Sequence, residues 1–337
     1  MSFEQIISLL STVDARFVVI LCRHNADPDA ICSAYALASL LKQSRPVMDV
    51  EIGAAHGISR LSRHLLQHLP IEVKTQPSVE KANAIVLVDT NTIQQLDSLA
   101  EKVRNLGAPI IVVDHHAGHP ETEQVAKICI TNEEASSTCE IVYDFYKQTG
   151  VKPGENEAKA LFLGIAFDTR HFVLANSTTL KNIAELIDAG VNAQETLSLL
   201  SLPMDFSERV ARLKASRRTR LFRVGKWIVA LSHVSAYQAS AARAMIELGA
   251  HVAAVGGEKN GGLEISLRSS LEFCKETNVH LGKDVAKPVG EYLHGMGGGH
   301  ATAAGVNGEG DVEIGLKRCL WLLKEKLSNH NQVVTLK

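Results

Sequence analysis

Acidic side chains follow three apolar runs of the chain, at the point where each run ends. The first ending is RHNADPDA (23–30), the second is Asp89 after AIVLV, and the third is DHH (114–116). Carboxylates packed close together raise one another's pKa, and a divalent cation removes that penalty. A set rich in oxygen and imidazole, without thiolate, favours Mn²⁺ or Mg²⁺ over Zn²⁺. The pattern therefore predicts a divalent-metal site.

A fourth segment, GIAFDTRHF, is expected to bring Asp168 to this site from the end of a helix. So many carboxylates indicate a pair of ions about 3.5–4 Å apart, with Asp89 as the bridging ligand. Taken singly, each aspartate fits a helix cap or a turn better than a metal ligand, but three such strand endings together favour the site. The expected residues are Asp27, Asp29, Asp89, His115 and Asp168, with His24 and His116 nearby.

The runs that carry these endings predict a parallel sheet in an α/β fold. Segments 17–23, 84–89 and 108–114 are β-branched and almost continuously apolar, which is typical of strands buried on both faces. Segment 30–44 has the helical period, so helices are expected on both faces of the sheet. The carboxyl ends of parallel strands share one edge, which is expected to bring the three endings together across a crevice.

Further helices are expected where capping residues precede apolar periods. Ser137 and Glu140 form a capping-box pattern, and Gly150 suits the end of that helix. Helical patterns follow over 156–169 and 179–190.

The length of 337 residues favours two domains over one core. The expected division is a metal-binding catalytic domain over 1–190, a helical linker over 191–222, and a smaller substrate-binding α/β domain over 223–337. The second domain is expected to contain three strands, WIVALSHV, HVAAVGGEK and LEISLRSS, a helix over 237–249 and a final helix near 313–328.

A basic, helix-like stretch over 206–226 has two interpretations. It fits a surface that follows phosphates beside the site, or the solvated face of a connecting helix, and the second is favoured because such charge runs usually coat exposed helices. Aromatic residues make up 5% of the chain and none interleave with the basic ones, which argues against a long single-stranded substrate.

Composition excludes other classes of protein. The net charge of −2 gives no general attraction to nucleic acid, so an anionic partner must be held locally. No run of about 20 apolar residues predicts a membrane span, and no basic signal-peptide start is present. The six scattered cysteines form no CxxC pair and are expected as buried thiols in a reducing, cytoplasmic location.

The chain resembles a known family in the order and spacing of these segments. NADPDA, Asp89, DHH (114–116) and FDT (167–169) resemble the four metal motifs of the DHH-family phosphoesterases, and SLRSS (266–270) and GMGGGHATAAG (295–305) resemble motifs of their C-terminal DHH-associated domain. The resemblance spans about residues 15–325. It implies a hydrolase of the compact two-domain branch, whose members degrade short oligoribonucleotides or 3′-phosphoadenosine 5′-phosphate, while some cleave dinucleotides.

The resemblance also implies residue roles. Asp27 would hold one Mn²⁺ ion, and the second ion would be held by Asp29, His115 and Asp168. Asp89 would bridge the two ions, and Mg²⁺ is the alternative metal. A hydroxide bridging the ions would attack phosphorus in line, with His116 beside it as a hydrogen-bonding or proton-handling group. The implied substrate-binding residues are Arg268, Gly297, Gly298, Gly299 and His300, with a helix beginning after His300 that would face the substrate phosphate.

One position departs from the family pattern. The family usually has a histidine four residues before the first motif aspartate; this chain has Arg23 there, and His24 comes one residue late. Three outcomes are open: a bulge that lets His24 reach the metal, a first site with fewer ligands, or Arg23 as a fixed positive charge in place of the metal. Retained hydrolysis is the favoured interpretation because the other five expected ligands are present.

The expected partner is a nucleotide or a short single-stranded RNA or DNA, with no membrane partner, and homodimerisation is left open. Two other functions are weighed against the nucleotide hydrolase. An inorganic pyrophosphatase or exopolyphosphatase would use the same metal chemistry. A nucleotide-binding protein that no longer hydrolyses would follow if Arg23 abolished the first metal site.

Overall fold

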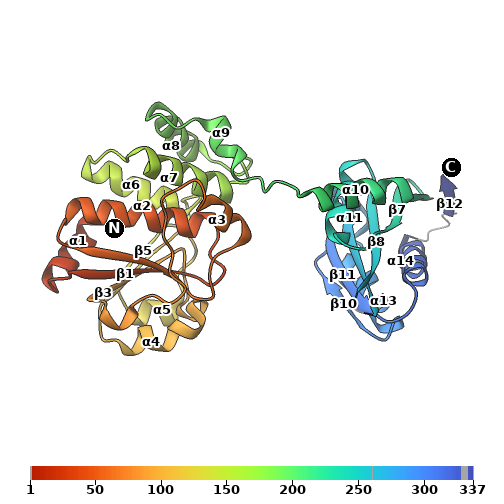
Figure 1. The fold of residues 1–337 in the computed structure, drawn as a ribbon, viewed down its shortest axis with the longest axis horizontal. Helices are drawn as coiled ribbons and strands as arrows, with labels where there is room; N and C mark the ends of the chain where they lie inside the picture. Colours follow the sequence, from red (N-terminus) through yellow and green to blue (C-terminus); the bar gives the residue numbers. More distant parts are fainter. Residues whose placement is uncertain (1, 260, 328–332, 337) are drawn as a thin grey trace. The chain divides into compact units, whose positions relative to one another are not determined.

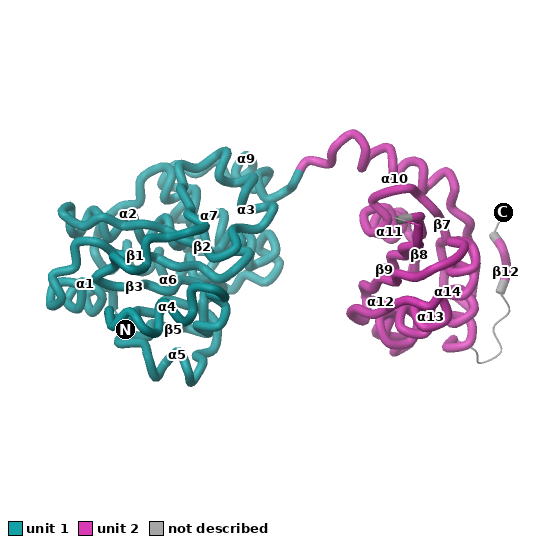
Figure 2. Tube along the Cα trace, turned by 60° about the horizontal axis from the view of Figure 1, so that its bottom comes forward, with its two compact units in different colours: residues 1–202 teal, residues 203–337 magenta. Residues whose placement is uncertain are grey.

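The computed structural model describes residues 2–259, 261–327 and 333–336. The chain divides into two compact units, Met1–Leu202 and Pro203–Lys337 (Figure 2). The segment 191–222, expected as a linker, contains α9 (Ala193–Ser198) in the first unit and α10 (Phe206–Arg218) in the second. No helix within the described ranges combines the length and the apolar character that crossing a bilayer requires.

The first unit is built on an all-parallel sheet with the strand order β2-β1-β3-β4-β5 (Figure 1). The strands are β1 (Phe17–Cys22), β2 (Asp49–Ala54), β3 (Ala84–Val88), β4 (Ile110–Asp114) and β5 (Ala126–Thr131). The three predicted strands are confirmed and lie next to one another, with β3 at the centre. Strands β2 and β5 were not predicted, because DVEIGA and AKICIT mix polar with apolar residues and flank the sheet at its edges.

Helices cover both faces of this sheet, as predicted (Figure 1). Val18 and Ile20 of β1 belong to the core that includes residues of α1, α2, α6 and α7, whereas Val19 and Leu21 pack in a second core with residues of η1, η2 and α4. Continuous apolar strands are therefore required, since alternate side chains enter two different cores. The helical elements are α1 (Phe3–Thr12), α2 (Pro28–Ser44), α3 (Arg60–Leu65), η1 (Val79–Lys81), η2 (Ile93–Leu99), α4 (Ala100–Asn105), α5 (Pro120–Val125), α6 (Thr138–Thr149), α7 (Glu155–Asp168) and α8 (Ser177–Asp188).

Two capped helices carry the site. Asp27 is the N-cap of α2 and accepts from the backbone N–H of Ala30 at 3.1 Å, with Pro28 in the first turn. Ser137 is the N-cap of α6, as the sequence predicts, and Gly150 ends that helix with a φ of 68°. The second half of the predicted capping box is shifted, because Glu140 accepts from the backbone of Ser136 at 2.6 Å.

The second unit is built on a mixed sheet with the order β10-β11-β9-β8-β7-β6-β12, in which β7 and β8 pair in parallel and the other pairs are antiparallel. Its strands are β6 (Arg220–Val224), β7 (Trp227–His233), β8 (Val252–Lys259), β9 (Gly262–Ser269), β10 (Met296–Gly299), β11 (Ala303–Gly308) and β12 (Val333–Leu336). Its further helical elements are α11 (Gln238–Glu247), α12 (Leu271–Thr277), η3 (Leu281–Ala286), α13 (Lys287–Tyr292) and α14 (Val312–Leu327).

These elements confirm the predicted smaller α/β domain with its three strands and two helices. One expectation needs correction: the basic stretch 206–226 is helical only to Arg218, after which the chain enters β6. The β-branched and aromatic side chains of RLFRV pair with β7, and this pairing overrides the helical appearance of the arginine spacing.

Candidate metal centre

The carboxyl ends of β1, β3 and β4 bring the predicted acidic and imidazole groups to one edge of the first unit's sheet. The side chains form two sets, and within each set all the potential ligand atoms lie within 4.8 Å of one another. The first set comprises Asp89, Asp114, His115 and His116, and the second comprises Asp29, His115 and Asp168. His115 belongs to both sets, so the two sets form one continuous cluster.

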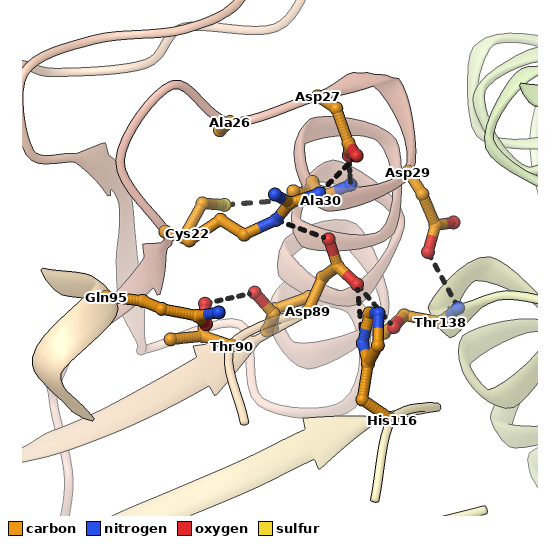
Figure 3. A network of polar contacts seen from close by, with 12 residues as sticks. Cys22, Ala26, Asp27, Asp29, Ala30, Asp89, Thr90, Gln95, His116 and Thr138 are labelled. Atoms are coloured by element: carbon orange, nitrogen blue, oxygen red, sulfur yellow. Dashed lines mark hydrogen bonds and ion pairs between the residues drawn. The ribbon is translucent and has the colours of Figure 1, made fainter. Parts of the chain in front are cut away.

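Asp29 is fully buried against the start of α6. Its Oδ2 accepts from the backbone N–H of Thr138 at 2.7 Å (Figure 3). Its Oδ1 accepts from the backbone N–H of Cys139 at 3.0 Å. Gly164 of α7 allows this approach, because a Cβ built there would lie 2.8 Å from Oδ1 of Asp29 and 2.2 Å from the Cys139 sulfur. The carboxylate is therefore fixed by three elements, α2, α6 and α7.

Asp168 is the last residue of α7, as predicted, and its Oδ2 lies 3.1 Å from Nε2 of His115. The same His115 nitrogen lies 3.7 Å from Oδ1 of Asp89. The helix end and two strand ends therefore meet at this imidazole.

Asp89 lies at the centre of the cluster, only 1% exposed, directly after the central strand. Its Oδ1 is within 3.3 Å of the Thr138 hydroxyl and 3.5 Å of Nδ1 of His116, while its Oδ2 lies 3.2 Å from Nε of Arg23. Figure 3 shows Asp89 between Asp27 and His116. Its φ of 51° is in the left-handed region, which for a residue with a side chain costs on the order of 1 kcal/mol or more and marks functional sites.

Arg23 points into the cluster and supplies its fixed positive charge. Its Nη2 donates to Oδ2 of Asp27 and its Nε donates to Oδ2 of Asp89. Asp27 therefore has one oxygen on the guanidinium and the other on the cap of α2, and it belongs to neither set of ligand atoms.

His24 lies outside both sets. Its backbone N–H donates to the carbonyl of Gln95 at 2.9 Å, its Nδ1 lies 3.2 Å from the same oxygen, and its side chain is exposed. Strand β1 ends at Cys22 and His24 lies in the turn that follows, so Arg23 is directed to the carboxylates while His24 is directed away. Of the six residues predicted as ligands, the structure thus groups four and leaves out His24 and Asp27.

Asp114 is a site residue for which the sequence analysis predicted no role, although it is the first residue of the DHH triplet. It is fully buried, and its Oδ1 accepts from the backbone N–H of His116 at 2.8 Å and lies 2.7 Å from Nδ1 of that ring. Its Oδ2 has no hydrogen-bond partner among the described residues. The available signal was its position as the last residue of a buried strand, where a carboxylate must find a charged partner.

The electrostatics of the cluster show a shortage of positive charge. Burial, followed by the charges of Asp27 and Asp114, raises the pKa of Asp89 to about 7 in spite of Arg23. Burial also raises the pKa of Asp29 well above its ordinary value. Burial lowers the pKa of His115, but the neighbouring carboxylates Asp168, Asp29 and Asp89 have the larger, opposite effect. The net result is a pKa raised to about 9.

A divalent cation fits this donor set. Five carboxylates share the cluster with one guanidinium, and one buried carboxylate oxygen, Oδ2 of Asp114, is left without a partner among the described residues. Oxygen and imidazole donors in this proportion suit Mn²⁺ or Mg²⁺.

The second unit contains the residues expected to bind substrate. Arg268 lies on β9, opposite Ala303 of β11 and Ala253 of β8, and its Nη1 donates to the carbonyl of Leu267 at 2.8 Å. Burial and the charge of Arg243 lower the pKa of Arg268, and no carboxylate partner for Arg268 is found among the described residues.

The glycine segment forms a strand rather than a loop before a helix. Gly297, Gly298 and Gly299 belong to β10, and the chain after His300 turns directly into β11, with the N–H of His300 donating to the carbonyl of Ala303 at 2.7 Å. The expected helix after His300 was wrong, because ATAAGV pairs with β9 and β10. A Cβ at residue 297 would lie 1.8 Å from the carbonyl oxygen of Ala286, whereas one at residue 298 would meet nothing within 4 Å.

The chain is similar to proteins of a known family. A model of the DHH family, N-terminal domain, matches residues 17–165. An uncharacterized protein of Methanocaldococcus jannaschii is 36% identical over 294 residues, which cover 86% of each chain.

Two further relatives from Bacillus subtilis have described activities. A bifunctional oligoribonuclease and PAP phosphatase is 28% identical over 198 residues, which cover 57% of this chain and 59% of that protein. A manganese-dependent inorganic pyrophosphatase is 26% identical over 279 residues, which cover 80% of this chain and 87% of that protein. Among solved structures, an exopolyphosphatase-related protein from Bacteroides fragilis has a TM-score of 0.64 at 19% identity, covering 96% of both chains, which shows a shared fold.

Proposed function

The chain belongs to the DHH family, and from that premise we propose that it hydrolyses the phosphoester bonds of short oligonucleotides, 3′-phosphoadenosine 5′-phosphate or dinucleotides with the help of a divalent metal. The observation that carries the proposal is the cluster of carboxylates and imidazoles at the carboxyl edge of the parallel sheet. Ligands of open α/β sheets bind at this edge.

The metal would be held by Asp29, Asp89, His115 and Asp168, with Asp114 as the added candidate. When bound, Mn²⁺, or Mg²⁺ as the alternative, would neutralise these carboxylates and stabilise the negative charge that grows on the phosphoryl oxygens. The protein would hold the carboxylates in place through α6, which donates to Asp29, and α7, which ends in Asp168.

His116 is the proposed proton-handling residue. Its side chain is 47% exposed, and its Nδ1 lies 2.7 Å from Oδ1 of Asp114, an arrangement that orients the ring and leaves Nε2 for a reacting group. The hydrogen bond to Asp114 raises the pKa of His116, which favours the protonated ring as a proton donor.

The proposed substrate-binding residues lie in the second unit and are Arg268, Gly297, Gly298, Gly299 and His300. The guanidinium of Arg268 lacks a carboxylate partner among the described residues, and its planar donors match a phosphate. Gly298 presents its backbone without a neighbouring atom at the position of a Cβ, so that a ligand can approach it closely.

The nucleotide substrate is supported by the similarity to the oligoribonuclease and PAP phosphatase, and the pyrophosphatase relative supports a second candidate, inorganic pyrophosphate. The free thiols at all six cysteines fit the proposed cytoplasmic location.

The test is release of phosphate or nucleoside monophosphate from a short RNA, 3′-phosphoadenosine 5′-phosphate, linear diadenylate and pyrophosphate, each with and without Mn²⁺. Metal-dependent release from a nucleotide that is lost in Asp89→Ala supports the proposal, and fastest release from pyrophosphate supports the second candidate. Full activity of Asp89→Ala would contradict both. Nucleotide binding without any release would identify a binding protein instead.

A further inference from the structure

We infer that the centre holds one divalent cation per chain rather than a pair, because the guanidinium of Arg23 occupies the space between Asp27 and Asp89 that a second cation would need. The inference rests on the proposed function and specifies its metal content.

Both oxygens of Asp27 are engaged, and one of them by a positive charge. Its Oδ1 accepts from the first turn of α2, at 3.1 Å from the backbone nitrogen of Ala30, and its Oδ2 accepts from Nη2 of Arg23. The side chain of Asp27 is 17% exposed, so it is largely held by these two contacts. A metal bound by Oδ2 of Asp27 would have to displace the guanidinium or lie directly beside it.

Asp89 uses its two oxygens on opposite sides. Oδ2 lies 3.2 Å from Nε of Arg23, whereas Oδ1 faces Thr138 at 3.3 Å, His116 at 3.5 Å and His115 at 3.7 Å. Oδ2 of Asp89 therefore contacts the arginine, and Oδ1 faces the other residues of the candidate ligand set. A carboxylate placed in this way links a guanidinium to a single metal site.

Neither candidate ligand set depends on Asp27. The two sets share His115. The unpartnered Oδ2 of Asp114 is likewise part of the set that contains His115. The donors that still need a positive charge are thus gathered around one imidazole.

The guanidinium also repels a second cation. Arginine stays protonated at every pH that the folded protein experiences, and the pKa of Arg23 is raised because Asp27 and Asp89 outweigh the effect of its burial. A divalent ion placed between the same two carboxylates would share a poorly solvated space with this charge. Arg23 thereby supplies permanently part of the positive charge that a second ion would bring.

The experiment counts bound metal directly. The full chain, stripped with EDTA, is dialysed to equilibrium against Mn²⁺, and the bound manganese is measured by atomic absorption and by electron paramagnetic resonance. We expect one ion per chain, with the resolved hyperfine pattern of a magnetically isolated ion. Two ions per chain in the unaltered protein would overturn the inference.

Variants of Arg23 give the second readout. Arg23→His removes the guanidinium and adds a nitrogen ligand, so it should bind two ions, whose spectrum is broadened by spin coupling. Arg23→Lys keeps the charge and should stay at one ion. Arg16→His is the matched control, because Arg16 is 76% exposed and precedes the opposite end of β1, and it should also bind one ion.

The outcomes separate this inference from the proposed function. One ion in Arg23→His, with the fold intact by circular dichroism, would overturn the inference, since the guanidinium would then not be what excludes the second ion. Hydrolysis by a protein that binds two ions would overturn the inference and leave the proposed function standing. Absence of any bound manganese in the unaltered protein would overturn the inference, and absence of bound Mg²⁺ as well would overturn the proposed function.

Discussion

The backbone N–H of Thr138 donates to Oδ2 of Asp29 at 2.7 Å, across 109 positions of the sequence. The neighbouring N–H of Cys139 donates to Oδ1 of the same carboxylate at 3.0 Å. Asp29 therefore serves α6 as an additional cap, besides Ser137, while it lies within reach of His115 and Asp168. The start of one helix and the candidate metal centre depend on the same side chain.

This double role predicts that Asp29→Asn destabilises the protein even without metal. An amide NH₂ would face one of the two buried backbone N–H groups, which would lose its acceptor at a cost on the order of 1–3 kcal/mol. Urea unfolding in EDTA should show a lower midpoint. The matched control is Asp188→Asn, at the exposed end of α8, which should leave the midpoint unchanged. Equal midpoints for the two variants would contradict the capping role.

The raised pKa of Asp89 predicts a pH-dependent stability of the metal-free protein. The folded pKa is about 7 and the ordinary value is 3.8, so the unfolded chain loses this proton first as the pH rises. The contribution of Asp89 to the free energy of unfolding is therefore complete below pH 3.8 and is lost as the pH rises toward about 7. In EDTA, the Tm of the unaltered protein should fall relative to that of Asp89→Asn across this range.

Addition of Mn²⁺ should remove most of this difference, because a cation favours the ionised carboxylate. Asp49→Asn, at an exposed position of β2, is the control and should follow the unaltered protein at every pH. Parallel Tm curves for the unaltered protein and Asp89→Asn in EDTA would show that Asp89 ionises at its ordinary value.

The glycines of β10 offer a test that separates substrate binding from folding. Gly298→Ala adds a methyl group into open space, so it should leave the Tm unchanged and raise KM for the nucleotide by about tenfold or more, if the substrate approaches this backbone. Gly297→Ala places its methyl group on the carbonyl of Ala286 and should lower the Tm. An unchanged KM in Gly298→Ala would remove the glycine from the binding site.

Arg268 is expected to act through its planar pair of donors rather than through charge alone. Arg268→Lys should therefore raise KM for a nucleotide by about tenfold, which corresponds to about 1.4 kcal/mol, without changing the amount of bound Mn²⁺. Arg223→Lys, an exposed position of β6, should leave KM unaltered. If Arg268→Lys behaved like Arg223→Lys, the guanidinium would not contact the phosphate.

The parallel sheet of the first unit could be predicted because its physical requirements are visible in single segments. Strands β1, β3 and β4 are buried on both faces, and only continuous apolar runs satisfy that environment. Their polar endings then had to share an edge, which placed Asp89 and His115 in one cluster. Edge strands such as β2 lack this signature because part of their length faces solvent.

The remainder depends on side-chain direction and on pairing between distant segments, which no local pattern encodes. Whether Arg23 or His24 faces the carboxylates is decided by one backbone turn, and Asn25, with a φ of 52°, follows immediately. The strand after His300 forms because β9 and β10 are available to pair with it. The role of Asp114 appears only once His116 is seen to turn back onto it.

Gly164 has a bearing on which ion the centre accepts. Since α7 packs so tightly on Asp29 and Cys139 that a single methyl group would not fit, the separation between Asp29 and Asp168, one turn further along α7, is set by the contact between helices. Any larger residue at this position would force α7 outward and carry Asp168 with it. The radius of a cation that would suit Asp29 and Asp168 therefore depends partly on Gly164, which is not among the candidate ligands.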